Sequence, residues 1–126
     1  MSVLGVGTDI LDERRIARLV ERGNVRFLAH WYTPAEIALC DQSSRPERLA
    51  ARCFAVKEAT LKAVGVSFPG PIRWREIEVL TGEDGGPTVQ LHGETATYAS
   101  HVGVLRLHAS TASHGGWVAA VVVAEG

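Results

Sequence analysis

Residues 44–65, SRPERLAARCFAVKEATLKAVG, decide the fold that we predict for this chain. Ser44 and Glu47 have the spacing of a helix N-cap and its partner glutamate, with a proline between them. Gly65 is a typical helix end. Between these signals the apolar side chains recur at helical spacing, at Leu49, Cys53, Phe54, Leu61 and Val64. The segment predicts a helix of about five turns, the longest in the chain.

The residues before this helix predict one strand and two shorter helices. Residues 3–10 are apolar and β-branched, which favours a strand. Apolar residues then recur at helical intervals over residues 12–24. The sequence Thr33-Pro34-Ala35-Glu36 combines a capping hydroxyl, a proline and a glutamate three residues after the cap, so a helix is expected from Pro34 through Cys40.

The residues after the long helix predict mainly strands. In order, we expect strands at 72–80 and 88–91, a helix at 94–101, and strands at 104–109 and 117–124. The last strand is almost continuously apolar, which predicts burial on both faces. The order of elements predicts a single α+β domain over residues 1–126, with an antiparallel sheet packed on the long helix.

Composition excludes several classes of protein. The chain has 126 residues, of which 46% are hydrophobic and 21% charged, as in an ordinary globular domain. Its formal net charge of −1 argues against a general nucleic-acid binder. The longest apolar run, residues 117–124, is far below the ~20 residues that span a membrane. The first residues show no secretory signal, so we expect a cytoplasmic protein.

Two local features stand out from this average composition. Basic residues gather near the amino end, where an acidic partner could bind, at Arg14, Arg15, Arg18, Arg22 and Arg26. This arginine face could equally be solvated. The cysteines Cys40 and Cys53 lack the spacing of a zinc site, so we expect reduced packing thiols and no structural metal.

Three charged residues could carry chemistry. Glu58 and Lys62 lie four residues apart on the long helix and share one face, either as a solvated ion pair or as part of a phosphate site. Asp9 ends a strand that contains Gly5 and Gly7, and it is either a helix cap or a metal ligand. Magnesium needs only one or two protein carboxylates, so Asp9 and Glu58 would suffice if the fold brings them together.

Other catalytic patterns are weak. Ser113 and His114 are adjacent, so on one strand they would point to opposite faces, and no G-x-S-x-G elbow is present for a hydrolase. His114 is therefore either a turn residue or a phosphate contact. The chain also lacks a G-x-x-x-x-G-K-[ST] phosphate loop.

Three segments together resemble a known family. They are residues 5–10 (GVGTDI), residues 54–65 (FAVKEATLKAVG) and residues 111–114 (TASH). The chain resembles the holo-[acyl-carrier-protein] synthase type of 4'-phosphopantetheinyl transferase, and the pattern F-x-x-K-E-A-x-x-K-A-x-G is fully matched. The resemblance implies that family's fold, a homotrimer, and magnesium-dependent transfer of 4'-phosphopantetheine from coenzyme A to a serine of an acidic acyl carrier protein, with release of adenosine 3',5'-bisphosphate.

The resemblance also implies roles for individual residues. Asp9 and Glu58 would hold magnesium, and Glu58 and Lys62 would be catalytic. The coenzyme A contacts would be Arg52, Lys57, Lys62, Gly65, Pro87, Thr111, Ser113 and His114. The carrier protein would dock on Arg14, Arg15, Arg18 and Arg22.

Two other functions remain open at the level of sequence. Cys53 stands where the family often has arginine, which leaves room for a non-catalytic oligomeric module that binds coenzyme A or a nucleotide. The same carboxylates and lysine could also activate water in a small metal-dependent pyrophosphate hydrolase.

Overall fold

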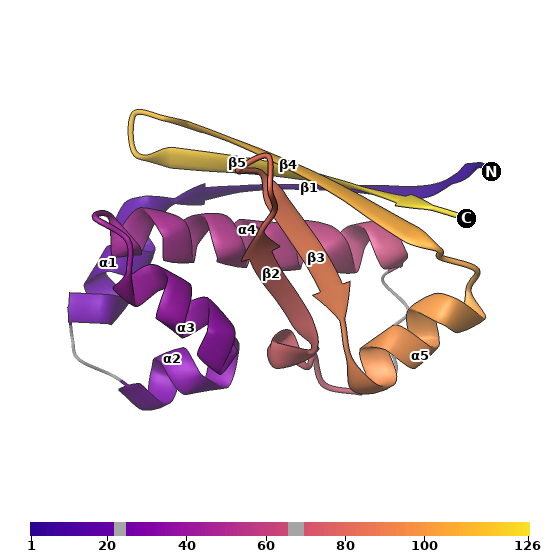
Figure 1. The fold of residues 1–126 in the computed structure, drawn as a ribbon, viewed down its shortest axis with the longest axis horizontal. Helices are drawn as coiled ribbons and strands as arrows, with labels where there is room; N and C mark the ends of the chain where they lie inside the picture. The colour runs from indigo at the N-terminus through magenta and orange to yellow at the C-terminus, as the bar shows by residue number, and fades with distance from the viewer. Residues whose placement is uncertain (22–24, 66–69) are drawn as a thin grey trace.

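A computed structural model describes residues 1–21, 25–65 and 70–126 of the chain. The elements in order are β1 (Val3–Asp12), α1 (Glu13–Glu21), α2 (Val25–Trp31), α3 (Pro34–Asp41), α4 (Pro46–Val64), the 3-10 turn η1 (Trp74–Glu76), β2 (Ile77–Thr81), β3 (Pro87–Leu91), α5 (Gly93–His101), β4 (Arg106–His114) and β5 (Trp117–Glu125) (Figure 1). The predicted α+β class is confirmed. Among the described residues, no helix is both long and apolar enough to cross a membrane.

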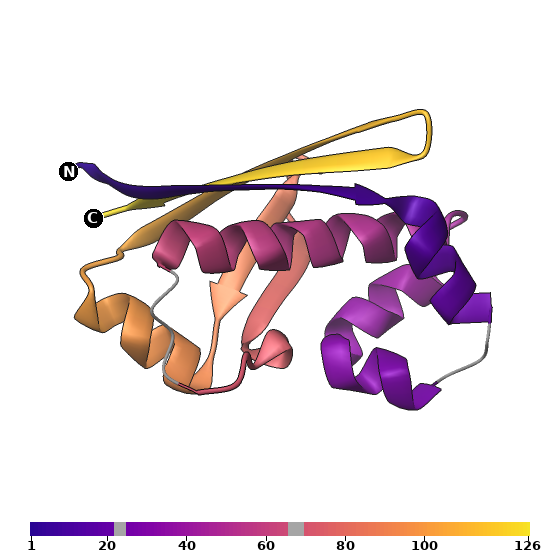
Figure 2. The ribbon, with the colours of Figure 1, turned by 180° about the vertical axis from the view of Figure 1, so that it is seen from behind.

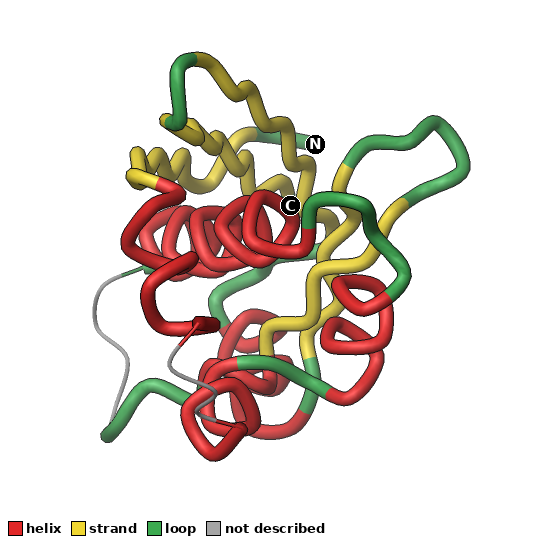
Figure 3. Tube along the Cα trace, turned by 90° about the vertical axis from the view of Figure 1, so that its left-hand side faces the viewer, coloured by secondary structure: helices red, strands yellow, loops and turns green. Residues whose placement is uncertain are grey.

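Helix α4 is the centre of the fold. An antiparallel sheet of order β1-β5-β4 lies along one side of it, and helices α1 to α3 gather near its amino-terminal half (Figures 1 and 2). The β2–β3 hairpin forms a separate two-stranded sheet that packs on α4 and approaches β4. Seen along α4, the three-stranded sheet lies above this helix, and the other helices lie below it or beside it (Figure 3).

Two glycines allow β1 to lie directly on the backbone of α4. A Cβ atom added to Gly7 would stand 1.8 Å from the Ala59 carbonyl oxygen, and one added to Gly5 would stand 2.0 Å from the Ala63 carbonyl oxygen. Neither position tolerates a side chain, and the helix residues that the two glycines contact are the alanines Ala59 and Ala63. Because strand side chains alternate, the next residue on the face of Gly5 and Gly7 is Asp9.

The core lies between α4 and the sheet. Small residues of α4 and alternate residues of β5 form its centre, at Ala55, Val56, Ala59, Ala63, Val118, Ala120, Val122 and Ala124. The prediction that the last strand is buried on both faces is wrong for this chain, because its other face, including Trp117 and Val121, is exposed.

The structure corrects two further predictions and adds one helix. The expected strand at 72–80 begins only at Ile77, because the Glu76 amide bonds to the Arg73 carbonyl at 2.9 Å and closes the turn η1. Helix α2 was not predicted. Ser44 does not cap α4, whose N-cap is Arg45 without a side-chain cap. The capping box of α3 is present as predicted, with reciprocal bonds between Thr33 and Glu36.

We expect Gly7→Ala to destabilise the fold by about 2 kcal/mol or more, because the new methyl group would force β1 away from α4. Gly86→Ala is the matched control. Its added Cβ would stand 3.4 Å from the nearest atom, an oxygen of Asp84, and we expect a change within about 0.5 kcal/mol. Denaturant unfolding measures both, and equal stability of the two variants would contradict the close packing of β1 on α4.

Candidate active site

Asp9 and Glu58 meet at the surface between β1 and α4. The β1 strand runs antiparallel to α4, and the pairing of Gly5 with Ala63 and of Gly7 with Ala59 directs Asp9 to the helix turn that carries Glu58. Burial, followed by a hydrogen bond and charge repulsion from Asp9, raises the pKa of the Glu58 carboxyl. Two carboxyl groups separated by 49 residues of sequence therefore share one site.

Positive charge surrounds this pair. The Lys62 ammonium lies 3.4 Å from Asp9 Oδ1 and donates a hydrogen bond of 2.9 Å to the Thr8 carbonyl oxygen. The charges of Lys62 and Arg15 partly oppose the rise in the pKa of Glu58. Half of the Lys62 side chain is exposed, so the ammonium is accessible to an anion. The site therefore places two acidic groups beside an ammonium that solvent can reach.

Grooves open on both sides of Glu58. One is lined by Asp9, Arg15, Trp31, Phe54 and Glu58. The other is lined by Glu58, Leu61, Lys62, Gly65 and Trp74. The Trp31, Phe54 and Trp74 rings form a cluster with centroids 5.0 to 5.2 Å apart, which gives the two grooves a shared aromatic wall.

The residues expected to contact coenzyme A fall into separate places. Gly65 lies in the groove with Glu58 and Lys62. Thr111 borders a surface hollow with Asp9 and Lys62, and its hydroxyl accepts hydrogen bonds from Arg52 at 3.2 and 3.3 Å. Arg52 and Pro87 line a different, small pocket that contains none of the three charged site residues.

The remaining predicted contacts are at the periphery. Ser113 and His114 are exposed at the end of β4, where the chain turns into β5. Arg14, Arg15 and Arg18 are exposed on α1, and Arg14 forms an ion pair of 2.8 Å with Asp12. Arg22 lies outside the described residues.

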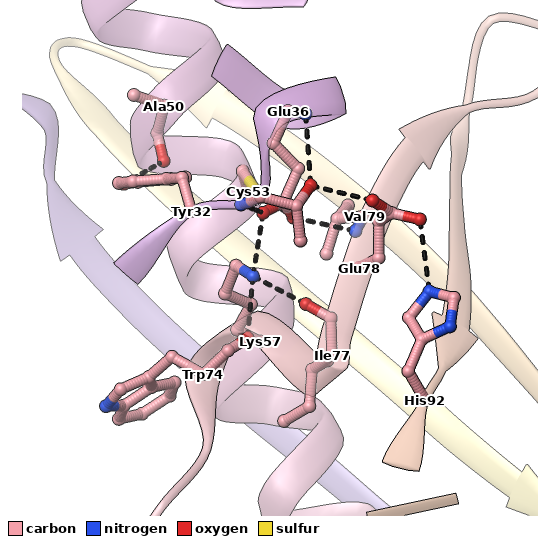
Figure 4. Close-up of polar contacts among 11 residues, drawn as sticks. Tyr32, Glu36, Ala50, Cys53, Lys57, Trp74, Ile77, Glu78, Val79 and His92 are labelled. Carbon is pink, nitrogen blue, oxygen red and sulfur yellow. Dashed lines mark hydrogen bonds and ion pairs between the residues drawn. The ribbon is translucent and has the colours of Figure 1, made fainter. Parts of the chain in front are cut away.

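Lys57 is not a surface contact. Its side chain is fully buried, and its ammonium pairs with Glu36 Oε1 at 2.9 Å and donates hydrogen bonds to the carbonyl oxygens of Trp74 and Ile77 (Figure 4). A ligand has no access to this ammonium in the described structure. The expectation that Lys57 contacts coenzyme A is therefore corrected, and the physical reason is the acidic partner that α3 places in the core.

That partner, Glu36, was recognised from the sequence only as part of a capping box. Its second carboxylate oxygen, Oε2, also accepts hydrogen bonds from the Cys53 thiol at 3.0 Å and from the Val79 amide at 2.8 Å. Burial raises the pKa of the Cys53 thiol well above its usual value, so the thiol stays protonated and acts as a donor. The aromatic wall was also missed, because Trp31 and Trp74 are distant in sequence and carry no shared motif.

The charged site has the donor chemistry of a magnesium site. Magnesium binds carboxylate oxygens and takes its other ligands from water and phosphate. Burial and then the nearby Asp9 raise the pKa of Glu58, and a cation bound by both carboxylates would favour their charged forms. Among the described residues, no group of three or more metal-ligating side chains occurs. Asp9 and Glu58 therefore fit the ion.

Comparison with known proteins establishes the family. A model described as the 4'-phosphopantetheinyl transferase superfamily matches residues 5–122, and the chain belongs to that superfamily. The holo-[acyl-carrier-protein] synthase of Koribacter versatilis is 40% identical over 124 residues, which cover 98% of each chain. The synthase of Serratia proteamaculans is 37% identical over 126 residues and is covered completely, as is this chain.

Solved structures agree. The crystal structure of the Neisseria meningitidis holo-[acyl-carrier-protein] synthase matches with a TM-score of 0.88 and 31% identity, covering 99% of this chain and 100% of that chain. The Helicobacter pylori synthase, solved in complex with coenzyme A, matches with a TM-score of 0.80 and 30% identity, covering 95% of this chain and 99% of that chain. The predicted resemblance to the synthase type, the fold and the assignment as a transferase are confirmed.

Proposed function

We propose that the chain transfers the 4'-phosphopantetheine group of coenzyme A to a serine hydroxyl of an apo acyl carrier protein, with magnesium, and releases adenosine 3',5'-bisphosphate. One observation carries the proposal: Asp9 and Glu58 line the same groove, with the Lys62 ammonium 3.4 Å from Asp9. The names of the relatives and the coenzyme A complex of the Helicobacter pylori enzyme support the choice of donor and acceptor.

The residues match the demands of this reaction. Attack of a hydroxyl on a pyrophosphate phosphorus needs alignment of the reactants and neutralisation of negative charge, and no protein nucleophile. Asp9 and Glu58 would hold magnesium, which when bound neutralises pyrophosphate oxygens. Lys62 is long and half exposed, so its ammonium can move from the Thr8 carbonyl to a phosphate oxygen of the donor.

In this proposal Glu58 would also receive the serine proton. It borders the groove on the α1 side, next to Arg15, as well as the groove that Lys62 lines. Its pKa is raised toward the range in which a carboxylate accepts a proton more readily. The acceptor hydroxyl would enter from the arginine side and the donor from the Lys62 side, with Glu58 between them.

Two rival functions use the same site. A pyrophosphate hydrolase would cleave coenzyme A with magnesium in the absence of any carrier protein. A non-catalytic binding module would bind coenzyme A without turnover. The relatives named as synthases favour the transferase over both.

We expect incubation of this protein with apo carrier protein, coenzyme A and magnesium to add the mass of phosphopantetheine to the carrier, read by mass spectrometry. Asp9→Asn and Glu58→Gln should each lower the rate by about 100-fold or more, because each removes a metal ligand while leaving the volume unchanged. No mass gain with several carrier proteins, or near-normal activity of either variant, would contradict the proposal.

The same variants test the metal by a route independent of activity. A carboxyl with a raised pKa contributes stability below its unfolded value, near 4.5, that is lost as pH rises through the folded value. Magnesium should offset this loss, so its effect on the melting temperature should be larger at neutral pH than below pH 4.5. Asp9→Asn should abolish that difference.

The carrier protein would dock on the arginines of α1. Arg14, Arg15 and Arg18 are exposed beside the groove that leads to Glu58, and Arg15 and Leu19 of α1 line that groove together with its aromatic wall. An acidic partner would be attracted there before its serine reaches the site.

We expect Arg18→Glu to raise the KM for the carrier protein about tenfold at low salt, with an unchanged KM for coenzyme A, because the charge acts on encounter with the acidic partner. High salt should remove most of the difference. The control Arg106→Glu changes an exposed arginine on β4, away from α1, and should have little effect. Equal loss of affinity for both substrates would mean that Arg18 does not define a carrier surface.

The resemblance implies a homotrimer, and the outer face of the large sheet supports it. Val6, Ile10, Trp117 and Val121 expose 56%, 66%, 47% and 36% of their surface there. Such a patch is typical of a protein interface. Ser113 and His114 lie in none of the grooves described for Asp9 and Glu58, so a neighbouring copy would have to supply them.

We expect this protein to elute as a trimer in light scattering, and two inactive variants to complement each other. Refolding Glu58→Gln together with His114→Ala should give more activity than the two samples measured apart, because some interfaces combine both intact halves. Glu58→Gln with Asp9→Asn is the control and should stay inactive, since both changes damage the same half. A monomer, or no complementation, would contradict the trimer.

Residues 1–126 would form one catalytic domain, because the described elements pack around α4. A single cooperative unfolding transition is the expected result. The cytoplasmic location stays a prediction from the sequence, checked by fractionation of the producing cell.

A further inference from the structure

Lys57 has a contact set that the proposed chemistry does not use. It is the largest fully buried side chain among the described residues. Its ammonium has three oxygen partners: Glu36 Oε1 at 2.9 Å, the Trp74 carbonyl at 2.8 Å and the Ile77 carbonyl. Figure 4 shows this ammonium between the carboxylate of α3 and the segment that enters β2. A buried charge with complete partners holds those partners firmly in place.

The partners of Lys57 connect it to two different parts of the fold, the core and the turn η1. Glu36 is itself held by the Thr33 amide, the Cys53 thiol and the Val79 amide, so it anchors the ammonium to the core. The two carbonyl bonds connect that anchor to η1, where the chain departs from the strand that its sequence favours. Lys57 therefore ties the backbone of Trp74 to α4.

Trp74 connects this tie to the candidate active site. Its half-buried ring packs on Phe54 and on Trp31, with centroids 5.2 and 5.0 Å apart. It also lines the groove that contains Glu58 and Lys62. Lys57 precedes Glu58 in α4, so one helix turn holds both the charged site and the tether of its aromatic wall.

We propose that Lys57 is a positioning residue that fixes the Trp74 wall of the groove beside Glu58 and Lys62, and so sets the affinity for the pantetheine arm of the donor. The inference rests on the proposed function. Leu61, Ile72 and Trp74 give this groove an apolar lining next to a charged end. That combination suits an uncharged amide chain joined to a pyrophosphate better than it suits the charged nucleotide.

The experiment compares two ligands and two variants. Lys57→Met keeps the volume of the side chain but cannot donate to the carbonyl oxygens. It should weaken binding of coenzyme A and raise its KM about tenfold, with kcat within about twofold of the wild type. Binding of adenosine 3',5'-bisphosphate, which lacks the arm, should be unchanged. Isothermal titration and steady-state kinetics measure these values.

Glu36→Gln is the matched control. It removes the charge of the anchor and should lower stability, yet it leaves the lysine donors near the Trp74 and Ile77 carbonyls, so coenzyme A affinity should change less than twofold. If Glu36→Gln and Lys57→Met lose coenzyme A affinity equally, Lys57 only stabilises the fold and does not position the Trp74 wall. This result would overturn the proposal. A fall in kcat with unchanged KM would also overturn it.

A double-mutant cycle tests the route through Trp74. Trp74→Ala should weaken coenzyme A binding, and Lys57→Met added to it should cause no further loss, because the wall is already absent. Fully additive losses would overturn the proposal. If Lys57→Met does not fold, Lys57→Gln takes its place, because its shorter, uncharged side chain cannot serve Glu36 and both carbonyl oxygens at once, and the same loss of coenzyme A affinity is expected. A wild-type protein that binds coenzyme A without transfer would contradict the proposed function, while the binding comparisons would still decide the role of Lys57.

Discussion

The contact of two glycines with the backbone of a helix is the constraint on which the site depends. Two residues of a strand advance about 6.6 Å and four residues of a helix about 6 Å, so β1 and α4 stay in step along their shared length. Gly5 lies over Ala63 and Gly7 over Ala59, and the following position on that face is Asp9. Close packing of the β1 backbone on α4 therefore holds Asp9 near Glu58 despite their like charges. A side chain at Gly5 or Gly7 would prevent this close packing.

Two neighbouring charged residues of α4, Lys57 and Glu58, have different roles. The ammonium of Lys57 is fully buried, and an acid and two carbonyl groups match it. The carboxyl of Glu58, one residue later, faces another acid and keeps a raised pKa. Removing one partner from a buried pair is costly, so Lys57 and Glu36 serve structure. Two acids at one solvent-accessible site, with Lys62 paired to only one of them, are a source of affinity for a cation, so Glu58 and Asp9 serve chemistry.

The sequence predicted the parts of this molecule that local signals specify. The long helix, the capping box at Thr33 and the helix from residue 94 follow from spacing within a few residues, and the pairing of Asp9 with Glu58 was expected from the family resemblance. The single-sided burial of β5 could not be predicted, because both of its faces are apolar and only the fold tells them apart. The burial of Lys57 depends on Glu36, a contact across 21 residues that no local pattern encodes.

The choice between transfer and hydrolysis depends on what occupies the groove on the α1 side of Glu58. The charges of Asp9, Glu58 and Lys62 would assist attack by water as well as by a serine hydroxyl. Ile16, Leu19, Trp31 and Phe54 give that groove an apolar wall, and Arg15 adds a positive charge. The apolar wall offers no hydrogen bonds to an ordered water molecule, whereas an acidic protein surface gains both apolar contact with the wall and charge attraction to Arg15. Productive placement of a nucleophile beside Glu58 therefore favours a macromolecular acceptor over solvent.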